Sequence, residues 1–346
     1  MVEKVFEKIK YGGVIPVSEK ISYSIAIRTL GTAGEKYEKL LKSIQKQTIQ
    51  PEKIAVVLPN GYKLPEYQLG CEEFVFSKKG MIPQRLEAIK YISSDYILFC
   101  DDDVELEENF VDKLSDAFAK GYACATGPLL EFFPPDSLRY KIASLLGGAC
   151  VMLHGRKNNY VRILKTGGWS YNHSIDTGNH RIYKTESLPW TCFLIKRDIM
   201  LNISFEDEMW AEKSGYSAFE DRVMFYKLVK NGYNACVVSD ALYKHNDAKT
   251  SVQALKLEPH YAGAFNHYVF WHRYIYSLSK TCLEKIWAVV CINYYILMSL
   301  IYGFVLCKTG RGSNEIRQIT IKGFRDAKKY VKSEEYNSLA PVIQTR

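Results

Sequence analysis

The chain has 346 residues, 47% of them hydrophobic, which is enough for one large domain or two ordinary ones with a real core. Its formal net charge of +8 suits a phosphorylated small molecule, an anionic membrane or nucleic acid. Nine scattered cysteines without a CxxC pair argue against a zinc ribbon and against a disulfide framework, and they favour a reducing compartment.

The first two-thirds of the chain alternates predicted strands and helices. Short apolar runs rich in β-branched residues predict strands at 23–30, 53–59, 72–77 and 95–100. Helical spacing of apolar residues predicts helices at 35–47, 82–93 and 108–121. This alternation predicts an α/β fold, with a mostly parallel sheet covered by helices. Ligands of such sheets bind at the carboxyl ends of the strands.

Three carboxylates, Asp101, Asp102 and Asp103, directly follow the predicted strand 95–100. Aspartates in this place often only cap the next helix or face solvent. Three in a row after a buried strand repel one another, and a divalent cation such as Mg²⁺ or Mn²⁺ relieves that repulsion through oxygen ligands. The spacing can aim Asp101 and Asp103 at one point while Asp102 turns away. It therefore predicts a metal and phosphate site.

Several ordered segments resemble the family 2 glycosyltransferases, which have the GT-A fold. The segment GMIPQRLEAIKYISSDYILFCDDDV (80–104) is similar to the family's Arg-bearing helix and Asp-Asp-Asp strand end, and SAFEDRVMFYKLVKNGYNACVV (217–238) to its Glu-Asp helix. Segments 24–61 and 191–200 complete a resemblance over about residues 22–250. Two positions depart from the family: Asn60 replaces a frequent acidic residue that holds the nucleotide base, and Leu86 replaces an Asn after Arg85.

The resemblance implies a nucleoside-diphosphate sugar as donor and Mn²⁺ or Mg²⁺ as cofactor. It implies that Asp103 binds the metal directly, that Asp101 reaches the metal or the ribose through water, and that His245 completes the metal site. Arg85 either donates two parallel hydrogen bonds to phosphate or pairs with Asp101, unless it is a surface arginine. Donor contacts are expected from Arg28, Thr29, Asn60, Arg85, Asp101 and Asp102.

Glu220 and Asp221 begin a predicted helix, where the helix dipole stabilises carboxylates whatever their role. The resemblance implies that Asp221 is the general base that accepts the proton of the acceptor, and that Glu220 binds the acceptor. A single displacement then inverts the anomeric centre. Trp190, in a predicted strand at 189–197, either stacks on an acceptor sugar or packs in the core. The stretch 131–188 shows little periodicity and is predicted to form loops or a small insertion.

Residues 286–307 form an apolar stretch about as long as a membrane span, after an aromatic and basic segment at 265–280. It predicts one transmembrane helix, helices lying in the inner leaflet, or a buried hairpin. Because nucleotide sugars are cytosolic, one span would place the basic tail outside, against the positive-inside tendency. We therefore favour helices in the inner leaflet with the tail at its surface.

Three regions are expected: an N-terminal lead-in at 1–21 without a signal peptide, a GT-A catalytic domain at 22–250, and a helical, membrane-associated region at 251–346. The expected activity is hexosyl or deoxyhexosyl transfer to a glycan or lipid-linked glycan at the cytoplasmic face of a membrane, without nucleic acid as a partner. Two alternatives stay open. One is a nucleotidyltransferase, although RTLGTAGEK (28–36) is a poor phosphate loop. The other is a non-catalytic, membrane-associated sugar-binding protein.

Overall fold

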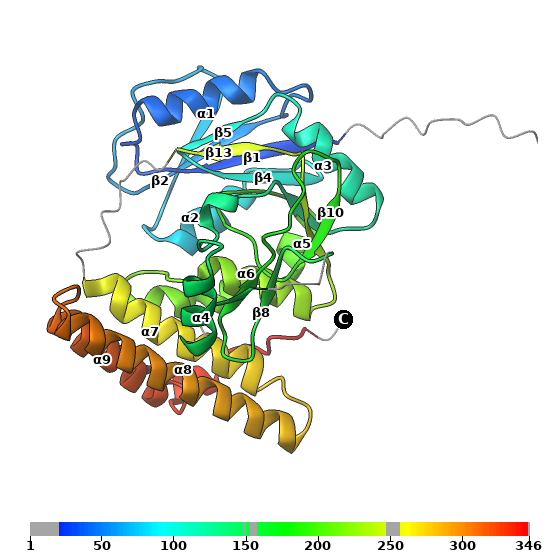
Figure 1. Cartoon of the computed structure of the whole chain (residues 1–346). Coiled ribbons are helices and arrows are strands. Elements are labelled where there is room, and N and C mark those ends of the chain that lie inside the picture. The colour runs from blue at the N-terminus through cyan, green and yellow to red at the C-terminus, as the bar shows by residue number, and fades with distance from the viewer. Residues whose placement is uncertain (1–20, 148–149, 153–157, 247–256, 345–346) are drawn as a thin grey trace, which may run out of the picture.

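An eight-stranded sheet runs through the centre of the upper part of the molecule (Figure 1). The computed structural model describes residues 21–147, 150–152, 158–246 and 257–344, so the expected lead-in at 1–21 lies almost wholly outside the described residues. The strand order is β10-β12-β6-β11-β4-β1-β2-β3. The strands are β1 (Tyr23–Arg28), β2 (Ile54–Pro59), β3 (Glu72–Ser77), β4 (Tyr96–Asp101), β6 (Cys124–Thr126), β10 (Ile182–Thr185), β11 (Cys192–Lys196) and β12 (Ala235–Val238).

The sheet confirms the predicted fold class, a mostly parallel mixed sheet of the GT-A type flanked by helices. Strands β3, β2, β1 and β4 are parallel neighbours, and β6 is parallel to β12. Strand β11 runs antiparallel between β4 and β6, and β10 is antiparallel to β12. Strands β1 and β4 are central and covered on both faces, which explains why they read as unbroken apolar runs.

Helices cover both faces of this sheet. They are α1 (Glu35–Gln45), α2 (Met81–Ile89), α3 (Phe110–Ala119), α5 (Arg197–Asn202) and α6 (Glu220–Lys230), with a 3₁₀ segment η2 (Phe205–Ser214). Helices α1 and α3 bury their apolar stripes in one core, while α2 and α6 pack in another. Strand β4 serves both cores, because Leu98 points to the first, and Ile97 and Phe99 point to the second.

The stretch 131–188 is more ordered than predicted. It contains a 3₁₀ turn η1 (Leu130–Phe132), helix α4 (Leu138–Gly147), a small sheet of β7 (Cys150–Met152), β8 (Val161–Ile163) and β9 (Trp169–Tyr171), and the edge strand β10. Of the two predicted alternatives, loops or a small insertion, the structure has the small insertion; its strands of three residues are too short to show an alternating pattern in the sequence. Two more short strands, β5 (Val104–Leu106) and β13 (Tyr243–His245), pair with each other beside the main sheet.

The C-terminal region is helical. It consists of α7 (Leu257–Trp271), a π-helical turn η3 (His272–Tyr276), α8 (Cys282–Lys308), α9 (Asn314–Tyr330) and α10 (Glu334–Asn337). Helix α8 is continuous across 286–307, so the hairpin alternative is wrong. Its N-terminus is fixed where the Thr281 hydroxyl accepts a hydrogen bond from the Glu284 N–H at 3.2 Å. By length and composition alone, α8 is the one helix among the described residues that could cross a membrane.

The chain after α8 returns to the body of the protein. Helix α9 lies along α7 so closely that a Cβ on Gly323 would be 2.6 Å from the Tyr261 carbonyl oxygen. Further on, the Asn231 amide donates to the Val342 carbonyl at 2.9 Å, and Arg273 donates to the Ala340 carbonyl at 2.8 Å. The chain that follows α8 is therefore packed against α7, against the turn before α8 and against the end of α6.

Candidate active site

The carboxyl ends of β1 and β4 lie side by side, and each ends in a charged residue. The register of these two strands pairs Arg28 with Asp101. The Arg28 guanidinium donates to Asp101 Oδ1 through Nε at 3.2 Å and Nη2 at 3.1 Å. Because parallel strands present their carboxyl ends at one edge, strand pairing alone brings these side chains together.

Arg85, on α2, is a second guanidinium on Asp101. Its Nη2 donates to Asp101 Oδ1 at 3.1 Å and to the Trp190 carbonyl at 3.2 Å. The side chain is buried, and burial lowers its pKa to about 10 although Asp101 opposes this shift. The alternative that Arg85 is a surface arginine is wrong, and the pairing with Asp101 is present. Two cations therefore already balance the charge of Asp101.

Asp102 turns into the protein, toward the end of β1. The Thr29 hydroxyl donates to Asp102 Oδ2 at 2.5 Å, and the Gly31 N–H donates to the same hydroxyl at 2.9 Å. Burial raises the pKa of Asp102 to about 6, helped by Asp101 and Asp103, while the Thr29 bond and Arg28 oppose the rise. Asp102 and Thr29 thus fasten the end of β4 to the end of β1.

Asp103 meets His245 although 142 residues separate them. The antiparallel pairing of β13 with β5 places His245 opposite Val104, and His245 Nε2 lies 3.4 Å from Asp103 Oδ1. On its other side, His245 Nδ1 lies 3.8 Å from Glu131 Oε1. Within the described ranges no group of three or more His, Cys, Asp or Glu side chains is arranged to hold a metal ion. Asp103 and His245 therefore form a pair of potential ligands, and Asp101 faces the two arginines.

Glu220 and Asp221 begin helix α6 after a strained residue. Phe219 has a φ of 68°, in the left-handed region, where a bulky residue costs about 1–3 kcal/mol. Burial, and then the adjacent Asp221, raise the pKa of Glu220 to about 8. Burial also raises the pKa of Asp221, although the Arg222 N–H donates to Asp221 Oδ1 at 2.6 Å. A raised pKa brings a carboxylate closer to the value that suits a general base at neutral pH.

Arg85 connects the two acidic groups across a pocket of about 410 Å³. Its Nη1 lies 3.9 Å from Glu220 Oε1 while its Nη2 holds Asp101. The pocket is lined by Arg85, Asp101, Phe132, Trp169, Pro189, Trp190, Thr191, Tyr216, Ser217, Ala218, Phe219, Glu220, Asp221, Pro259 and Gly263. Asp221 also lines a smaller neighbouring pocket of about 170 Å³. The strand-end carboxylate and the helix-start carboxylates thus face one space.

Trp190 lies against this pocket and is 4% exposed. The Arg85 guanidinium sits 4.4 Å from the centre of its ring, and the ring packs against Phe205 at 5.0 Å and Phe193 at 5.7 Å. These contacts give Trp190 a packing role and a role in holding Arg85. Asn60 follows β2 at the same edge of the sheet and is exposed, with its N–H donating to the Ser77 carbonyl at 2.8 Å.

Arg222 is a residue that sequence reasoning missed. It is fully buried next to Asp221, and its guanidinium lies 4.3 Å from the centre of the Phe270 ring, 4.4 Å from Phe219 and 4.7 Å from Trp169. Burial lowers its pKa to about 10, so it remains charged at neutral pH. By its cation–π contact with Phe219, Arg222 helps to hold the strained start of α6. Only its position after Asp221 could have singled it out.

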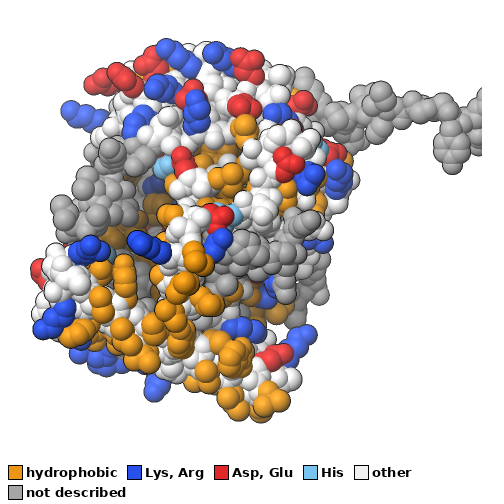
Figure 2. All heavy atoms as spheres, in the orientation of Figure 1, with side chains coloured by type: hydrophobic (Ala, Val, Ile, Leu, Met, Phe, Trp, Pro, Cys, Tyr) orange, Lys and Arg blue, Asp and Glu red, His pale blue; other side chains and the backbone are white. Residues whose placement is uncertain are grey.

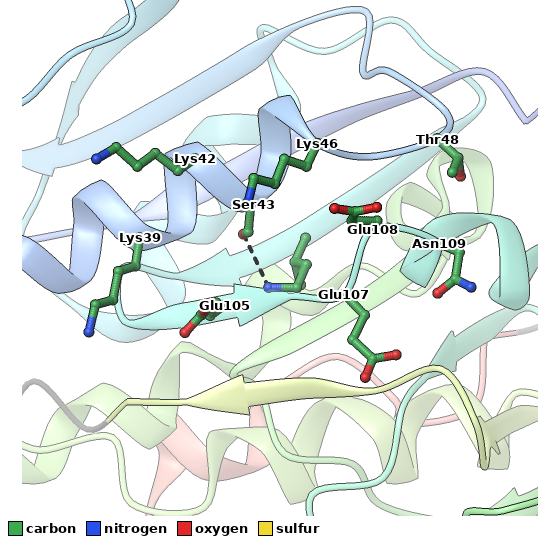
Figure 3. A pocket seen from close by; sticks show the side chains of 10 residues that line it. Lys39, Lys42, Ser43, Lys46, Thr48, Glu105, Glu107, Glu108 and Asn109 are labelled. Carbon is green, nitrogen blue, oxygen red and sulfur yellow. Dashed lines mark hydrogen bonds between the residues drawn. The ribbon is translucent and has the colours of Figure 1, made fainter.

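A separate hollow of about 600 Å³ lies between α1 and residues 105–109 (Figure 3). Lys39 and Lys42 on α1 and Lys46 just after it line one side, and Glu105, Glu107 and Glu108 line the other side. The Leu106 N–H donates to the Ser43 hydroxyl at 3.1 Å, which fixes β5 against α1. None of the predicted site residues lines this hollow, so it is a surface of mixed charge apart from the candidate site.

The shifted pKa of Glu220 predicts a pH-dependent stability. A carboxyl group whose pKa is raised on folding costs stability as pH rises from its unfolded value, 4.5, toward its folded value, about 8. We therefore expect Glu220→Gln to raise the free energy of unfolding, relative to the unchanged protein, by on the order of 1–3 kcal/mol at pH 8 and by little at pH 4.5. Denaturant unfolding at the two pH values measures this difference.

The matched control for this prediction is Glu66→Gln, which changes an exposed glutamate. That variant should show the same small effect at both pH values. An equal effect of Glu220→Gln at pH 4.5 and pH 8 would show that folding does not raise the pKa of Glu220.

Three comparisons relate the chain to known proteins. Residues 63–199 match the family described as Glycosyl transferase family 2. No curated protein sequence matches the chain. Among solved structures 170 chains match; one is the crystal structure of S. aureus TarS, with 13% sequence identity and a TM-score of 0.49. That match covers 92% of this chain and 50% of the other, so this chain spans half the length of that protein.

The range matched by the family contains only part of the candidate site. It includes Arg85, the triplet Asp101–Asp103 and Trp190, while Arg28, Thr29 and Asn60 precede it. Glu220, Asp221 and His245 follow it. The roles considered for the latter three therefore depend on how the fold brings them to the matched segment.

Proposed function

We propose that the chain moves a hexosyl or deoxyhexosyl group, with inversion, from a nucleoside-diphosphate sugar to a hydroxyl of a glycan or lipid-linked glycan. The match of residues 63–199 to the family 2 glycosyltransferases supports this proposal. One observation supports this most strongly. Arg85 joins Asp101, at the end of β4, to Glu220, at the start of α6, across a single pocket. A donor bound at the strand ends would then face an acceptor bound at α6.

The proposed step is a single displacement. The Asp221 carboxylate accepts the proton of the acceptor hydroxyl, and the hydroxyl oxygen forms a bond to the anomeric carbon. The bond from that carbon to the diphosphate oxygen breaks, and the nucleoside diphosphate leaves with the electron pair. Glu220, whose pKa of about 8 keeps it mostly protonated at neutral pH, donates a hydrogen bond to the acceptor. Attack from the side opposite the leaving group inverts the configuration.

The donor is proposed to bind along the ends of β1, β2 and β4. Arg28 and Arg85 supply the positive charge near its phosphates, and Asp101 keeps both guanidinium groups in position. Thr29 and Asp102 fix the strand ends on which these groups stand. Asn60, exposed after β2, is the proposed contact for the base in place of an acidic residue.

Asp103 and His245 fit a divalent cation that shares its remaining ligands with the donor. Mg²⁺ sites commonly use one or two protein ligands plus substrate phosphates, and an imidazole favours Mn²⁺ over Mg²⁺. Glu131 Oε1 lies 3.8 Å from the other nitrogen of His245, beyond hydrogen-bond distance. When bound, such a cation would balance the charge of the departing diphosphate.

A panel of nucleotide sugars with Mn²⁺ and glycan acceptors tests this proposal. We expect release of nucleoside diphosphate that depends on one sugar and one acceptor, and a product of inverted anomeric configuration by NMR. Release of pyrophosphate would instead identify a nucleotidyltransferase. Binding of sugar or nucleotide without any turnover would identify a non-catalytic binding protein.

We further propose that the protein is attached to the cytoplasmic face of a membrane through α8. The most apolar 18-residue window of this helix has a mean hydropathy of 2.0, and 11% of it is buried. Helix α9 returns to pack on α7, which supports a helix lying at the leaflet surface over one that crosses it. The donor pocket then stays on the cytosolic side, where nucleotide sugars are found.

A further inference from the structure

The lower face of the molecule is apolar and uncovered. Among the described residues 22 large hydrophobic side chains are exposed; α8 carries eleven of them and α4 carries four. On α8 the buried side chains are Ala288, Ile292 and Ile296, a single stripe facing the protein. Figure 2 shows hydrophobic side chains gathered over the region of α8 and continuing toward α4. An apolar surface this extensive marks an interaction site on a soluble domain.

Helix α4 is amphipathic, but its apolar side faces outward. Leu138, Ile142, Leu145 and Leu146 follow the spacing i, i+4, i+7 and i+8, which places them on one stripe. All four are exposed, Leu138 to 74%, while Ser144 is the buried residue of the helix. Helix α4 also lies beside α8 (Figure 1). The insertion therefore extends the apolar surface of α8.

Nearly all of the excess positive charge of the chain surrounds this surface. Residues 280–332 contain ten Lys and Arg and three Asp and Glu, so they carry a net +7 of the total +8. Lys280 and Lys285 lie at one end of α8, and Lys308 and Arg311 at the other, all exposed. An apolar helix with basic ends and a basic border matches the surface of an anionic leaflet.

A groove between α8 and α9 is lined by both apolar and positively charged side chains. Its volume is about 430 Å³, and its floor is formed by Ile296, Leu300, Ile321 and Phe324. Arg325, Lys328, Lys329 and Lys332 line the same groove. Within the described part of the chain, these three lysines form no ion pair with a carboxylate. An apolar floor with four cations suits the upper acyl chain and the phosphate of a phospholipid.

We propose that α4 and α8 together lie in the plane of an anionic bilayer leaflet, and that the α8–α9 groove holds the phosphate headgroup of one of its phospholipids. A second copy of the chain is a poorer occupant of this surface, because two faces of net +7 would repel each other. The proposal extends the membrane attachment proposed for α8 to α4 and to a defined headgroup groove. It does not depend on the transfer chemistry.

The test uses full-length protein, because α9 covers α7 and cannot be removed without exposing its core. Flotation with vesicles of phosphatidylcholine alone, or with about a third phosphatidylglycerol, measures binding at low and high salt. We expect binding to anionic vesicles that high salt weakens but does not abolish, since charge is screened within about 10 Å at 0.1 M salt and apolar contact is not. No flotation with either vesicle would overturn the proposal.

The contribution of α4 is tested with Leu138→Asp/Leu145→Asp. We expect at least a tenfold loss of vesicle binding with unchanged thermal unfolding, because both side chains are exposed in the free protein. The matched control is Leu64→Asp/Leu201→Asp, which changes two exposed leucines, one in the loop after β2 and one on α5. Wild-type flotation of the α4 variant would exclude α4 from the docking surface.

The groove is tested with Lys328→Glu/Lys332→Glu against Lys39→Glu/Lys46→Glu at the separate hollow beside α1 (Figure 3), which makes the same change in net charge. We expect only the groove variant to lose its preference for anionic vesicles. An equal loss of this preference in the two variants would show that it depends only on net charge, and would overturn the proposal that the groove binds a headgroup. Donor turnover, measured on the same proteins, should not change. If none of the proteins turned over donor while the unchanged protein still floated with vesicles, only the transferase proposal would be contradicted.

Discussion

Replacing Asp221 by Asn is expected to lower turnover by roughly 10²- to 10⁴-fold, the usual contribution of a general base. The amide keeps the size of the side chain and can still accept the hydrogen bond from the Arg222 N–H, so the start of α6 should keep its structure. Donor and Mn²⁺ binding should remain nearly intact, because Asp103, His245 and the two arginines on Asp101 are unchanged. Single-turnover kinetics with bound donor, together with donor titration, separate these effects.

The control for this prediction is Asp112→Asn on α3. Asp112 is also a carboxylate in the first turn of a helix, so both substitutions remove the same kind of interaction with a helix dipole. Asp112→Asn should leave turnover unchanged. If Asp221→Asn instead abolishes donor binding while turnover of bound donor is normal, Asp221 holds the donor and is not the base.

Replacing Asp103 by Ala is expected to abolish metal binding and metal-dependent transfer. Of the three carboxylates in the triplet, Asp103 is the one that lies beside His245, since Asp101 holds two arginines and Asp102 turns to Thr29. Loss of the charge stabilisation that a cation gives to a leaving diphosphate is worth several kcal/mol, or on the order of 10³-fold in rate. Mn²⁺ titration of transfer, and calorimetry with Mn²⁺ plus nucleoside diphosphate, measure both losses.

Two variants sharpen the interpretation of Asp103→Ala. Glu105→Ala removes a carboxylate two residues later that lines the separate hollow beside α1, and it should leave transfer unchanged (Figure 3). His245→Ala removes the proposed second ligand, and it should weaken Mn²⁺ binding without affecting the fold of β4. Full activity of Asp103→Ala after treatment with EDTA would refute the metal site at Asp103.

The location of the triplet Asp101–Asp103 at a strand end could be predicted from the sequence, because the residues that indicate it are adjacent in the chain. The run YILFC predicts a strand covered on both faces, and parallel strands place their carboxyl ends at one edge. The inward turn of Asp102 also follows from a local rule, since alternate residues of an extended segment point in opposite directions. Helix ends were predicted less well: the helix expected to reach residue 93 ends at Ile89, where tighter turns take over.

The sequence by itself determined the mostly parallel α/β sheet, the strand-end triplet and the apolar character of α8, because the burial pattern of each element lies in neighbouring residues. Only the tertiary structure decided that His245 meets Asp103, that two arginines occupy Asp101, and that Arg85 reaches Glu220. Each of these contacts joins residues far apart in the chain, and pairing of short strands such as β5 with β13 leaves no periodic signal. The return of α9 onto α7, which leaves α8 and α4 exposed on one face, depends likewise on packing between helices and not on the composition of either one.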